Sequence, residues 1–483
     1  MKKIQYKWMA LSCTSIGAFF SIFDSTALVI ALPSIMVDLH ASFTIILWTI
    51  LSYMLIITIF VPSIGRVADI IGRKKLYVEG FMIFTIGSFL SGSSINGEML
   101  ILFRIVQAFG AVLLITNSVA IVTDAFPKEE LGRALGINGM AFSVGAVVGP
   151  ILGGILTMLS WRYIFYVNVP VGILGTIWAQ KQLREIDVLP SNQRFDWKGT
   201  LLFISGMLIL LLGCTFGAFL GWINPFIIVS FILSAILIGL FIWLENKIKQ
   251  PMLDLRLFKS RILAFALISN LMSGIARGAI TFLLVLYLQG IKNFDPLMAG
   301  ILLTPFAACL MISSPISGRL SDKYGSRGLS TAGLIISAVG LIGFFLLEPD
   351  TSIIAIIIWM SIMGIGSGMF FSPNTNAIMS SVPPEKRGIA TGTRTMMMNV
   401  GNLISLAITM GVITTSITSE ALQGLFTGTQ VGSKGINIVL FMNGLHMVFF
   451  FSFIVCLIGA FLSYLRGPVP TWDKIPSIQQ NNR

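Results

Sequence analysis

The chain has 483 residues, of which 55% are hydrophobic and only 11% are charged, and its mean hydropathy is +0.90. This composition excludes a soluble globular protein of this length and indicates a polytopic membrane protein. The formal net charge of +12 would suggest a nucleic-acid partner only if membrane topology left it unexplained.

Apolar runs long enough to cross a bilayer, about 20 residues each, recur along the whole chain. The sequence predicts fourteen spans, at residues 8–32, 47–64, 76–93, 100–122, 135–159, 163–180, 199–219, 225–244, 262–288, 297–318, 329–347, 353–372, 389–413 and 438–465. The first run follows a basic start, but it is too long for a signal peptide and no small-residue cleavage site follows it directly. We therefore expect it to be retained as a helix.

The distribution of basic residues tests this count, because a missed helix would exchange the sides of all later loops. With the N-terminus in the cytoplasm, most of the 32 Lys and Arg residues fall in cytoplasmic loops. The sequence therefore predicts a multi-pass protein of the cell (plasma) membrane with both termini cytoplasmic. Orientation accounts for the positive charge, so no nucleic-acid partner is expected.

Two loop sequences recur in the same order in the two halves of the chain. GRVADIIGRKK, residues 65–75, is echoed by GRLSDKYGSRG, residues 318–328, and PKEELGRA, residues 127–134, is echoed by PPEKRGIA, residues 383–390. Such a pattern predicts duplicated halves of six helices each, with two extra helices between them. The expected parts are residues 1–185 and 256–466 for the two bundles, 186–255 for the extra helices and 467–483 for a cytoplasmic tail.

The glycines and charges of these loops have a local physical use. Gly65 and Gly72 permit a tight turn, and Asp69, Arg73 and Lys74 can pair with neighbouring helix ends. The corresponding residues of the second copy are Gly318, Asp322, Gly325 and Arg327. A solvated turn whose charge only sets topology is the alternative, and the repetition of the whole pattern argues against it.

A carboxylate interrupts the first apolar run. Asp24 stands in AFFSIFDSTALVIALP, residues 18–33. A lone carboxylate is costly in hydrocarbon, so Asp24 is expected to face the protein interior or a wet cavity.

Several motifs, in order, resemble those of one transporter family. FDSTALVIALP resembles its first-helix motif, GRVADIIGRKK its signature loop, and LFRIVQAFGA, residues 102–111, its helix-four motif, with Arg104 as the key basic residue. WRYIFYVNVPVG, residues 161–172, and FDWKG, residues 195–199, resemble its entry to helix six and its lead into the extra helices. The antiporter motif of helix five is matched by Gly136, Gly145, Gly149, Pro150, Gly153 and Gly154. To about residue 465 the chain resembles the major facilitator superfamily and, within it, the fourteen-helix drug:proton antiporters of the QacA/EmrB type.

This resemblance implies an all-α polytopic membrane protein with the major facilitator fold, two six-helix bundles plus two central extra helices. It implies proton-coupled efflux of amphipathic small molecules or drugs by alternating access. The expected partners are a small-molecule substrate, protons and the lipid bilayer, and the monomer is expected to be the functional unit. An exporter of an endogenous anionic or lipid-like metabolite is the alternative of the same fold, and a non-transporting membrane sensor is the alternative of another class. The two extra helices are expected to form an accessory hairpin outside the substrate path.

Asp24 and Arg104 are expected at depths that agree to about one helical turn, at about 1.5 Å per residue. In the family fold their helices share a bundle, so an interaction, direct or through Gln107 and water, is expected. Burial favours a neutral carboxylate and a nearby guanidinium favours a charged one, so movement of Arg104 would alternately capture and release a proton. The hypothesis is that Asp24 couples transport to protons and that Arg104 tunes it; a static ion pair is the alternative.

The glycines of helix five at 145, 149 and 153 lie four residues apart, on one face, where backbones can approach closely. Pro150 removes one helix hydrogen bond and invites a kink. The resemblance implies a close-packed seam between the halves that limits leakage, and ordinary small-residue helix packing is the alternative.

Asp124 ends the fourth helix near the signature loop. By resemblance it pairs with Arg73, while Asp69 faces the N-terminus of a helix in the other half and stabilises the outward-facing state. Unremarkable interfacial charges are the alternative.

Arg277 lies near the middle of the ninth run with no acidic residue of its own helix nearby, so it is expected to face a cavity. Two uses are open: it holds an anionic or carboxylate-bearing substrate, or it hydrogen-bonds to carbonyl groups. The second half has no acidic residue deep in its helices.

Enzyme chemistry is not expected. The only histidines are His40 and His446, which cannot supply a catalytic triad or a metal cluster. No phosphate-binding glycine motif followed by Lys-Ser or Lys-Thr is present, which argues against ATP as the energy source. No cofactor is expected, and the energy for transport would come from an ion gradient or from none.

Overall fold

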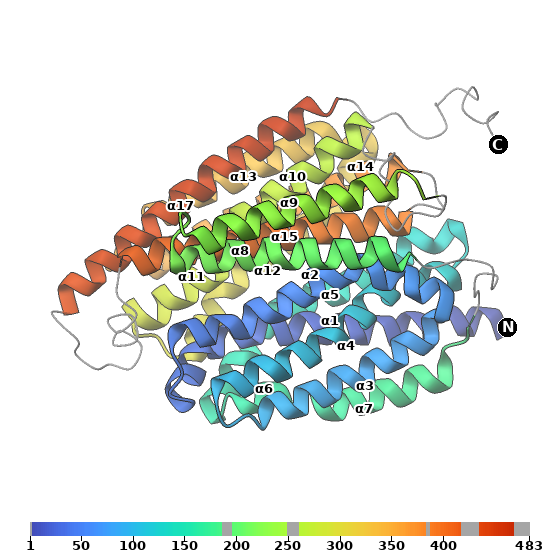
Figure 1. The fold of residues 1–483 in the computed structure, drawn as a ribbon, viewed down its shortest axis with the longest axis horizontal. Helices are drawn as coiled ribbons and strands as arrows, with labels where there is room; N and C mark the ends of the chain where they lie inside the picture. Colours follow the sequence, from blue (N-terminus) through green and yellow to red (C-terminus); the bar gives the residue numbers. More distant parts are fainter. Residues whose placement is uncertain (1, 186–195, 249–259, 383–386, 417–433, 468–483) are drawn as a thin grey trace.

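The computed structural model describes residues 2–185, 196–248, 260–382, 387–416 and 434–467 (Figure 1). Within these residues the secondary structure is helical and includes no strand. The first half contains α1 (Lys2–Asp38), α2 (Phe43–Ile71), α3 (Arg73–Gly92), α4 (Gly97–Ala125), α5 (Lys128–Leu159), α6 (Arg162–Tyr166) and α7 (Asn168–Gln182). The connecting pair is α8 (Trp197–Leu220) and α9 (Pro225–Glu245). The second half contains α10 (Arg261–Arg277), α11 (Ile280–Leu286), the π-helix η2 (Tyr287–Ile291), α12 (Pro296–Tyr324), α13 (Ser326–Phe345), α14 (Ile353–Ser380), α15 (Arg387–Ser416) and α17 (Lys434–Leu465).

Short polar side chains mark the beginnings of several helices. Ser42 and Asn96 cap α2 and α4, and Asp295 and Ser352 cap α12 and α14. In each case the side-chain oxygen accepts a hydrogen bond from a backbone N–H of the first turn, which would otherwise lack a partner in the helix. The helix starts of the second half therefore use the same device as those of the first.

Twelve helices in the described residues are long and apolar enough to cross a membrane. The predicted count of fourteen is not supported, because the runs at 76–93 and 163–180 do not meet the same criterion. The helix of the first run, α3, carries Arg73, Lys74, Lys75 and Glu79 and so has no sufficiently apolar stretch. The second run is divided at Val167 into the short α6 and the 15-residue α7, neither of which has the required length.

The two halves lie side by side, and α1 begins at the same end of the bundle as α17 ends (Figure 1). The pair α8 and α9 forms a hairpin in which Ser234 Oγ donates a hydrogen bond to the carbonyl oxygen of Gly206 at 2.9 Å. This hairpin packs on α2 of the first half and on α15 of the second half. The rings of Trp48 on α2 and Phe216 on α8 lie 5.3 Å apart between centroids. The hairpin is thus in contact with both bundles.

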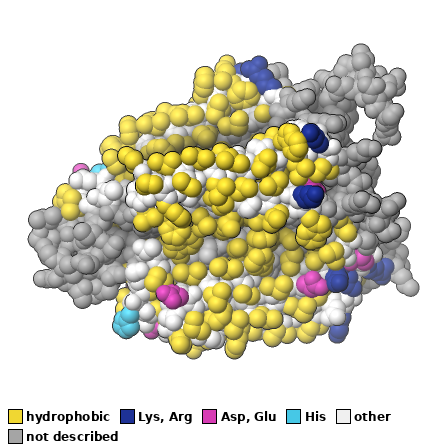
Figure 2. Space-filling view, in the orientation of Figure 1, with side chains coloured by type: hydrophobic (Ala, Val, Ile, Leu, Met, Phe, Trp, Pro, Cys, Tyr) yellow, Lys and Arg dark blue, Asp and Glu magenta, His cyan; other side chains and the backbone are white. Residues whose placement is uncertain are grey.

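The surface of the molecule follows the composition of the helices. Figure 2 shows hydrophobic side chains over most of the face, whereas most Lys and Arg side chains on it lie toward the end where α1 begins. An apolar belt with most of the basic side chains at one end is the surface expected of a protein that lies across a bilayer.

The internal repeat is present in the packing as well as in the loops. Gly80 on α3 lies against the carbonyl oxygen of Gly110 on α4, and Gly333 on α13 lies against the carbonyl oxygen of Gly366 on α14. A Cβ at any of these positions would collide with the neighbouring helix, so the same close helix crossing is built twice.

Backbone geometry gives the register of this repeat. His40 and Asn293 are the two described non-glycine residues with positive φ, at 47° and 55°, and Gly72 and Gly325 have φ of 114° and 85°. The same number of residues separates His40 from Asn293 as separates Gly72 from Gly325. From α4 and α14 onward, corresponding residues of the two halves are slightly further apart in the sequence, because the connection after α13 is longer than the connection after α3.

The two halves touch each other at the end of the bundle opposite to the start of α1. Gln289 Nε2 donates a hydrogen bond to the carbonyl oxygen of Ile30 at 2.9 Å, which joins η2 to α1. A Cβ at Gly154 on α5 would lie 2.6 Å from the carbonyl oxygen of Pro296 on α12, and Gly300 on α12 lies directly against the carbonyl oxygen of Pro150. The bundles are closed against each other at this end.

Candidate functional site

Asp24 lies in a fully buried polar cluster in the first half, with none of its surface exposed. Its Oδ2 lies 2.5 Å from Nη1 of Arg104, which is 1% exposed. Its Oδ1 accepts hydrogen bonds from Gln107 Nε2 at 2.8 Å and from Asn168 Nδ2 at 2.9 Å. The expected contact of Asp24 with Arg104 and Gln107 is present and direct, and both carboxylate oxygens have donors.

Arg104 is held in place by groups from three other helices. Its Nη1 also donates to Gln107 Oε1 at 2.6 Å, and its Nε donates to the carbonyl oxygen of Thr49 at 3.4 Å. The guanidinium lies 4.0 Å from the ring centroid of Tyr53 on α2 and 5.7 Å from that of Phe165 on α6. An aromatic face stabilises a cation more strongly when both are desolvated, so this position favours the charged guanidinium.

Asn168 and Ser88 belong to the cluster but are not predicted from the sequence. Ser88 Oγ on α3 accepts from Asn168 Nδ2 and from Gln107 Nε2, both at 3.2 Å, and donates to the carbonyl oxygen of Phe165 at 2.9 Å. The available signal for Asn168 was its place inside the motif WRYIFYVNVPVG. The cluster therefore joins α1, α3, α4 and α7 around one carboxylate.

This arrangement has a definite chemical capacity. Asp24 and Arg104 neutralise each other in a site closed to solvent, and a displacement of Arg104 would leave Asp24 buried without a cation. This is the arrangement that the proton-coupling hypothesis requires. A static pair that locks α1 to α4 has the same geometry and remains the alternative.

A second polar cluster lies at the turn between α2 and α3. Arg73 Nη1 lies 2.5 Å from Asp124 Oδ1, as the resemblance implied. Gly72 separates the two helices with a φ of 114°, a conformation that a side chain would strain. Gly65, within the last two turns of α2, lies near the Thr116 methyl group. The sequence predicts that Asp69 contacts the other half, but the side chain of Asp69 lies outside the described residues.

Glu185 completes this turn, although no sequence motif indicates it. Its carboxylate accepts hydrogen bonds from the backbone N–H groups of Lys74 at 3.2 Å and Lys75 at 3.3 Å, at the start of α3. A carboxylate at a helix N-terminus is stabilised by the unpaired N–H groups and by the helix dipole. The segment after α7 is thereby fastened to the turn that contains Gly72.

The corresponding turn of the second half is built differently. Gly325 also has a positive φ, of 85°, and Gly318 lies against Ser372 Oγ. Arg327 Nε donates to the carbonyl oxygen of Tyr464 on α17 at 2.7 Å. The side chain of Asp322 lies outside the described residues.

The glycine motif of α5 divides between two partners, which corrects the prediction of a single seam between the halves. A Cβ at Gly145 would lie 2.8 Å from the carbonyl oxygen of Phe19, and Gly149 and Gly153 also face α1 of their own half. Gly154 and Pro150 make the contact with α12 described above. The surroundings of Gly136 lie outside the described residues. The four-residue spacing identified one helix face, but that face packs inside the first bundle.

Arg277 is the last residue of α10 and lines a pocket of about 200 Å³ in the second half. Its Nε donates to the carbonyl oxygen of Ser273 at 3.3 Å. Both expected uses are therefore compatible with its position: one nitrogen bonds to a carbonyl group, and the side chain faces a pocket.

The described residues contain no group of three or more His, Cys, Asp and Glu side chains that could hold a metal ion. The two histidines have separate surroundings: His40 lies in the turn after α1, and His446 contacts the carbonyl oxygen of Leu347 at 2.7 Å.

Solved structures with a similar fold are transporters. A bacterial homolog of the human lysosomal transporter Spinster, in an inward-facing and unoccupied conformation, matches with a TM-score of 0.67 at 17% identity, over 95% of this chain and 97% of that chain. The human organic anion transporter MFSD10 (TETRAN) matches with a TM-score of 0.60 at 13% identity, over 93% and 99% of the two chains. At these identities the likeness concerns the fold.

Sequence relatives lead to the same family. The riboflavin transporter RibZ of Clostridioides difficile (strain 630) is 34% identical over 417 residues, which cover 86% of this chain and 90% of that protein. Multidrug resistance protein Stp of Mycobacterium tuberculosis (strain CDC 1551 / Oshkosh) is 31% identical, over 84% of this chain and 75% of that protein. Multidrug resistance protein 3 of Bacillus subtilis (strain 168) is 30% identical, over 87% and 82%. The family model of the Major Facilitator Superfamily matches residues 14–406 and, in a second match, residues 266–482. The chain therefore belongs to the Major Facilitator Superfamily, as a multi-pass membrane transporter and not an enzyme.

Proposed function

We propose that this protein exports amphipathic small molecules across the cell membrane in exchange for protons, by alternating access between its two halves. The observation that carries the proposal is the fully buried Asp24 in contact with one cation, Arg104. A buried carboxylate with a single charged partner is a suitable proton carrier, because its protonation depends on where that partner lies. The names of two relatives, both multidrug resistance proteins, support export.

In the proposed cycle, Asp24 is charged while Arg104 is in contact with it. As the halves change their relative position, a shift of α4 against α1 within the first half moves Arg104 away from the carboxylate, and a proton from the side of higher proton concentration binds a carboxylate oxygen of Asp24. When Arg104 returns, it displaces that proton to the other side and keeps its own charge. Gln107 and Asn168 hold the carboxylate in position in both steps through their amide donors.

With both termini in the cytoplasm, the closed end of the bundle faces outward, and the described conformation is then closed to the outside. We extend the proposal to fourteen membrane crossings, with α3 and the bent pair α6 and α7 in addition to the twelve apolar helices. Two observations support it: α3 packs along α4 and α7 within the first bundle, and the counterpart of α3 in the repeat is the apolar helix α13. The Arg73–Asp124 pair at the α2–α3 turn would stabilise one of the two states as a gate.

A second candidate is export of an endogenous anionic or lipid-like metabolite. Arg277 at a pocket of the second half favours it, since an anion would supply the partner that this guanidinium lacks among the described residues. The name of the relative RibZ, a riboflavin transporter, also supports a metabolite as substrate.

The proposed function can be tested in liposomes that contain purified wild type or Asp24→Asn. An imposed pH gradient is followed with an internal pH dye while lipophilic cations and anions are added one at a time. We expect substrate addition to dissipate the gradient with wild type and to leave it intact with Asp24→Asn, while substrate binding to that variant remains.

Asp38→Asn is the matched control, because Asp38 is the carboxylate that ends the same helix and binds Arg162 and Trp161 near the surface. This variant should couple like wild type. Equal coupling by Asp24→Asn and wild type would refute the role of Asp24, and the absence of any substrate-dependent proton movement in wild type would refute antiport.

A further inference from the structure

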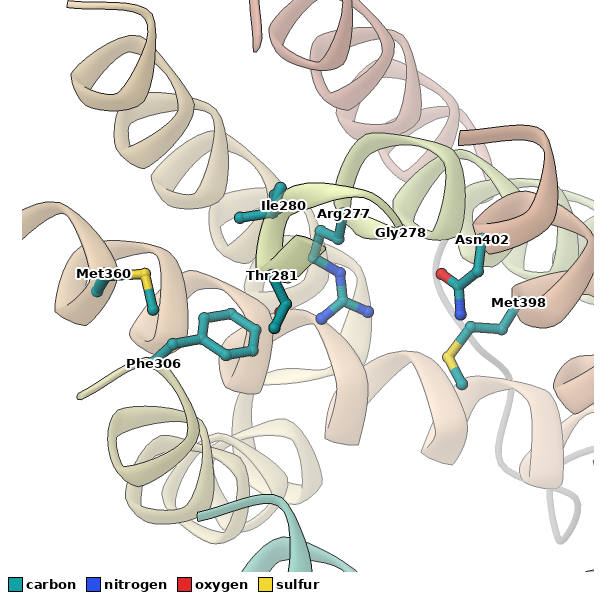
Figure 3. Close-up of a pocket in the computed structure, with 8 residues that line it drawn as sticks. All are labelled: Arg277, Gly278, Ile280, Thr281, Phe306, Met360, Met398 and Asn402. Carbon is teal, nitrogen blue, oxygen red and sulfur yellow. The ribbon is translucent and has the colours of Figure 1, made fainter. Parts of the chain in front are cut away.

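The pocket at Arg277 lies within the second half and is lined from four directions (Figure 3). Its lining residues come from α10 and α11, α12, α14 and α15: Arg277, Gly278, Ile280, Thr281, Phe306, Met360, Met398 and Asn402. The guanidinium of Arg277 points into the space between Thr281 and Met398, with the Asn402 side chain on the α15 side (Figure 3). A volume of about 200 Å³ is smaller than that of most ligand sites, so the pocket has room for one end of a drug-sized molecule.

A break in the helix places Arg277 at this pocket. The helix α10 ends at Arg277, and the chain becomes helical again at Ile280 as α11. At the break, the backbone N–H of Ala279 donates to Ser405 Oγ on α15 at 3.1 Å. A Cβ added at Gly278 would lie 2.5 Å from the Cα of Asn402, so only glycine permits this contact. The break is thus stabilised by α15 and orients the last side chain of α10.

The register of the internal repeat gives Arg277 a specific counterpart. The number of residues that separates Asp24 from Arg277 is the same as that between His40 and Asn293 and between Gly72 and Gly325. Arg277 therefore stands in the second half where Asp24 stands in the first.

The neighbours of Arg277 correspond in the same way. Phe306 on α12 takes the place of Tyr53 on α2. The packing of Gly110 against Gly80 recurs as the packing of Gly366 against Gly333. The number of residues from Gly110 to Gly366 is the same as that from Arg104 to Met360, so Met360 takes the place of Arg104. The Arg277 pocket is thus the counterpart of the buried Asp24 cluster.

The two counterparts differ in charge balance. In the first half, Asp24 and Arg104 neutralise each other. In the second half, the position that corresponds to Asp24 holds the guanidinium of Arg277. The position that corresponds to Arg104 holds the uncharged thioether of Met360. Among the described residues Arg277 has no ion pair, and its two terminal nitrogens have no hydrogen-bond partner. An unpaired charge at this depth is costly, and it is normally kept where a partner binds during function.

A second guanidinium extends the positive charge along α15. Arg394, Met398 and Asn402 are spaced four residues apart and so share one face of that helix. Arg394 Nε and Nη1 are buried without a hydrogen-bond partner, and the guanidinium lies 4.8 Å from the ring centroid of Phe371. The side of the second bundle that contains the pocket therefore carries two cationic side chains, neither of which has an acidic partner in the described residues.

We propose that the Arg277 pocket binds the anionic end of a flat, amphipathic organic substrate. This inference rests on the proposed transport function and specifies the charge of its substrate. A carboxylate or a comparable oxyanion would accept two parallel hydrogen bonds from the terminal nitrogens of Arg277. Thr281 and Asn402 offer further donors, while Phe306 and Met360 supply an aromatic and a polarisable apolar wall for the ring system.

The test uses two dyes that share one flat tricyclic ring system and differ in charge: fluorescein, an anion at pH 7.5, and the cation rhodamine 123. Binding to the purified full-length protein in nanodiscs is measured by fluorescence polarisation, with empty nanodiscs as the blank. We expect wild type to bind fluorescein more tightly than rhodamine 123. Arg277→Met should weaken fluorescein binding by about tenfold or more, and Arg277→Lys, which keeps the charge but loses the bidentate geometry, by less.

Met360→Glu is the second, independent variant. It places a carboxylate in the pocket at the position that corresponds to Arg104, so it should pair with Arg277, abolish fluorescein binding and reverse the preference toward rhodamine 123. The inference is refuted if wild type prefers rhodamine 123, or if folded Arg277→Met or Met360→Glu binds fluorescein within twofold of wild type. Where Arg277→Met does not fold, Met360→Glu decides.

The binding measurement needs no pH gradient, so it tests this inference independently of the proposed function. If fluorescein binds through Arg277 but its transport moves no protons, proton antiport fails and this inference stands. If rhodamine 123 drives proton movement and Arg277→Met changes nothing, antiport stands and this inference fails.

Discussion

Asp24 and Arg277 occupy corresponding positions in the two halves of the molecule and carry opposite charges. Asp24 has a guanidinium partner at 2.5 Å, whereas Arg277 faces a pocket with no carboxylate among the described residues. A duplicated fold thus holds a neutralised charge on one side and an unneutralised charge on the other. We expect the first side to exchange protons and the second to meet the substrate.

The first prediction concerns the partner of Asp24. Arg104→Met should lower the free energy of unfolding by about 3–5 kcal/mol, because it leaves a buried carboxylate without its cation. The double variant Asp24→Asn with Arg104→Met should recover much of this loss, since it removes both charges. Thermal unfolding of the purified proteins in one detergent would measure both effects. If the double variant is as unstable as the single one, the pair is not the reason for the loss.

The second prediction concerns Asn168, which the sequence did not identify. Asn168→Ala removes a donor to Asp24 Oδ1 at 2.9 Å and a bond to Ser88, so stability should fall by about 1–3 kcal/mol. Proton-coupled transport should fall with it, because the carboxylate is less well oriented. Asn246→Ala is the control, since Asn246 is the exposed residue directly after α9 and its side chain donates to the carbonyl oxygen of Ile242 in that helix. Equal transport by Asn168→Ala and this control would contradict the prediction.

The third prediction concerns the contact that closes one end of the bundle. Gly154→Val should hold the halves apart, because a Cβ there would already lie 2.6 Å from the Pro296 carbonyl oxygen. Spin labels at His40 and Asn293, on the two halves at that end, should report a longer mean distance in the variant. The four native cysteines, Cys13, Cys214, Cys309 and Cys456, are first replaced by serine or alanine.

Gly139→Ala is the control for this measurement, because Gly139 lies on the same helix and has open space around its Cβ position. It should leave the distance distribution of the parent protein unchanged. The interpretation of the α5–α12 contact as a closure fails if Gly154→Val and Gly139→Ala give the same distribution.

The fourth prediction concerns the turn between α2 and α3. Glu185→Ala should lower the free energy of unfolding by about 0.3–1 kcal/mol, because the first N–H groups of α3 lose a charged acceptor. Glu98→Ala removes a carboxylate from the first turn of α4, where the Asn96 side chain supplies the cap, so it should have the smaller effect. Thermal unfolding at low ionic strength compares the two, and a larger loss for Glu98→Ala would contradict the role of Glu185 as a cap.

The fifth prediction concerns Arg73 and Asp124, which lie 2.5 Å apart. Asp124→Asn should slow transport without abolishing substrate binding, because it weakens a contact that stabilises one conformational state. The exchange of the two residues, Arg73→Asp with Asp124→Arg, should restore part of the rate. Transport in liposomes and dye binding in nanodiscs separate the two effects. A loss of binding in Asp124→Asn that equals its loss of transport would contradict a gating role.

Some features of this protein follow from local sequence. The apolar runs, the duplicated loops and the similar depths of Asp24 and Arg104 depend only on hydropathy and on the constant rise of a helix, so they could be predicted. Two of the predicted spans did not meet the apolar criterion in the structure, because α3 carries charges and the α6–α7 segment bends.

Other features were decided by the tertiary structure. The glycines of α5 could be placed on one face, but only the fold determines that this face meets α1 while Gly154 meets α12. The roles of Asn168 and Glu185, and the presence of the Met360 thioether in the pocket of Arg277, likewise depend on residues distant in sequence. The physical reason is that helical periodicity gives the direction of a side chain relative to its own axis, whereas its partner depends on how each helix is rotated and placed against its neighbours.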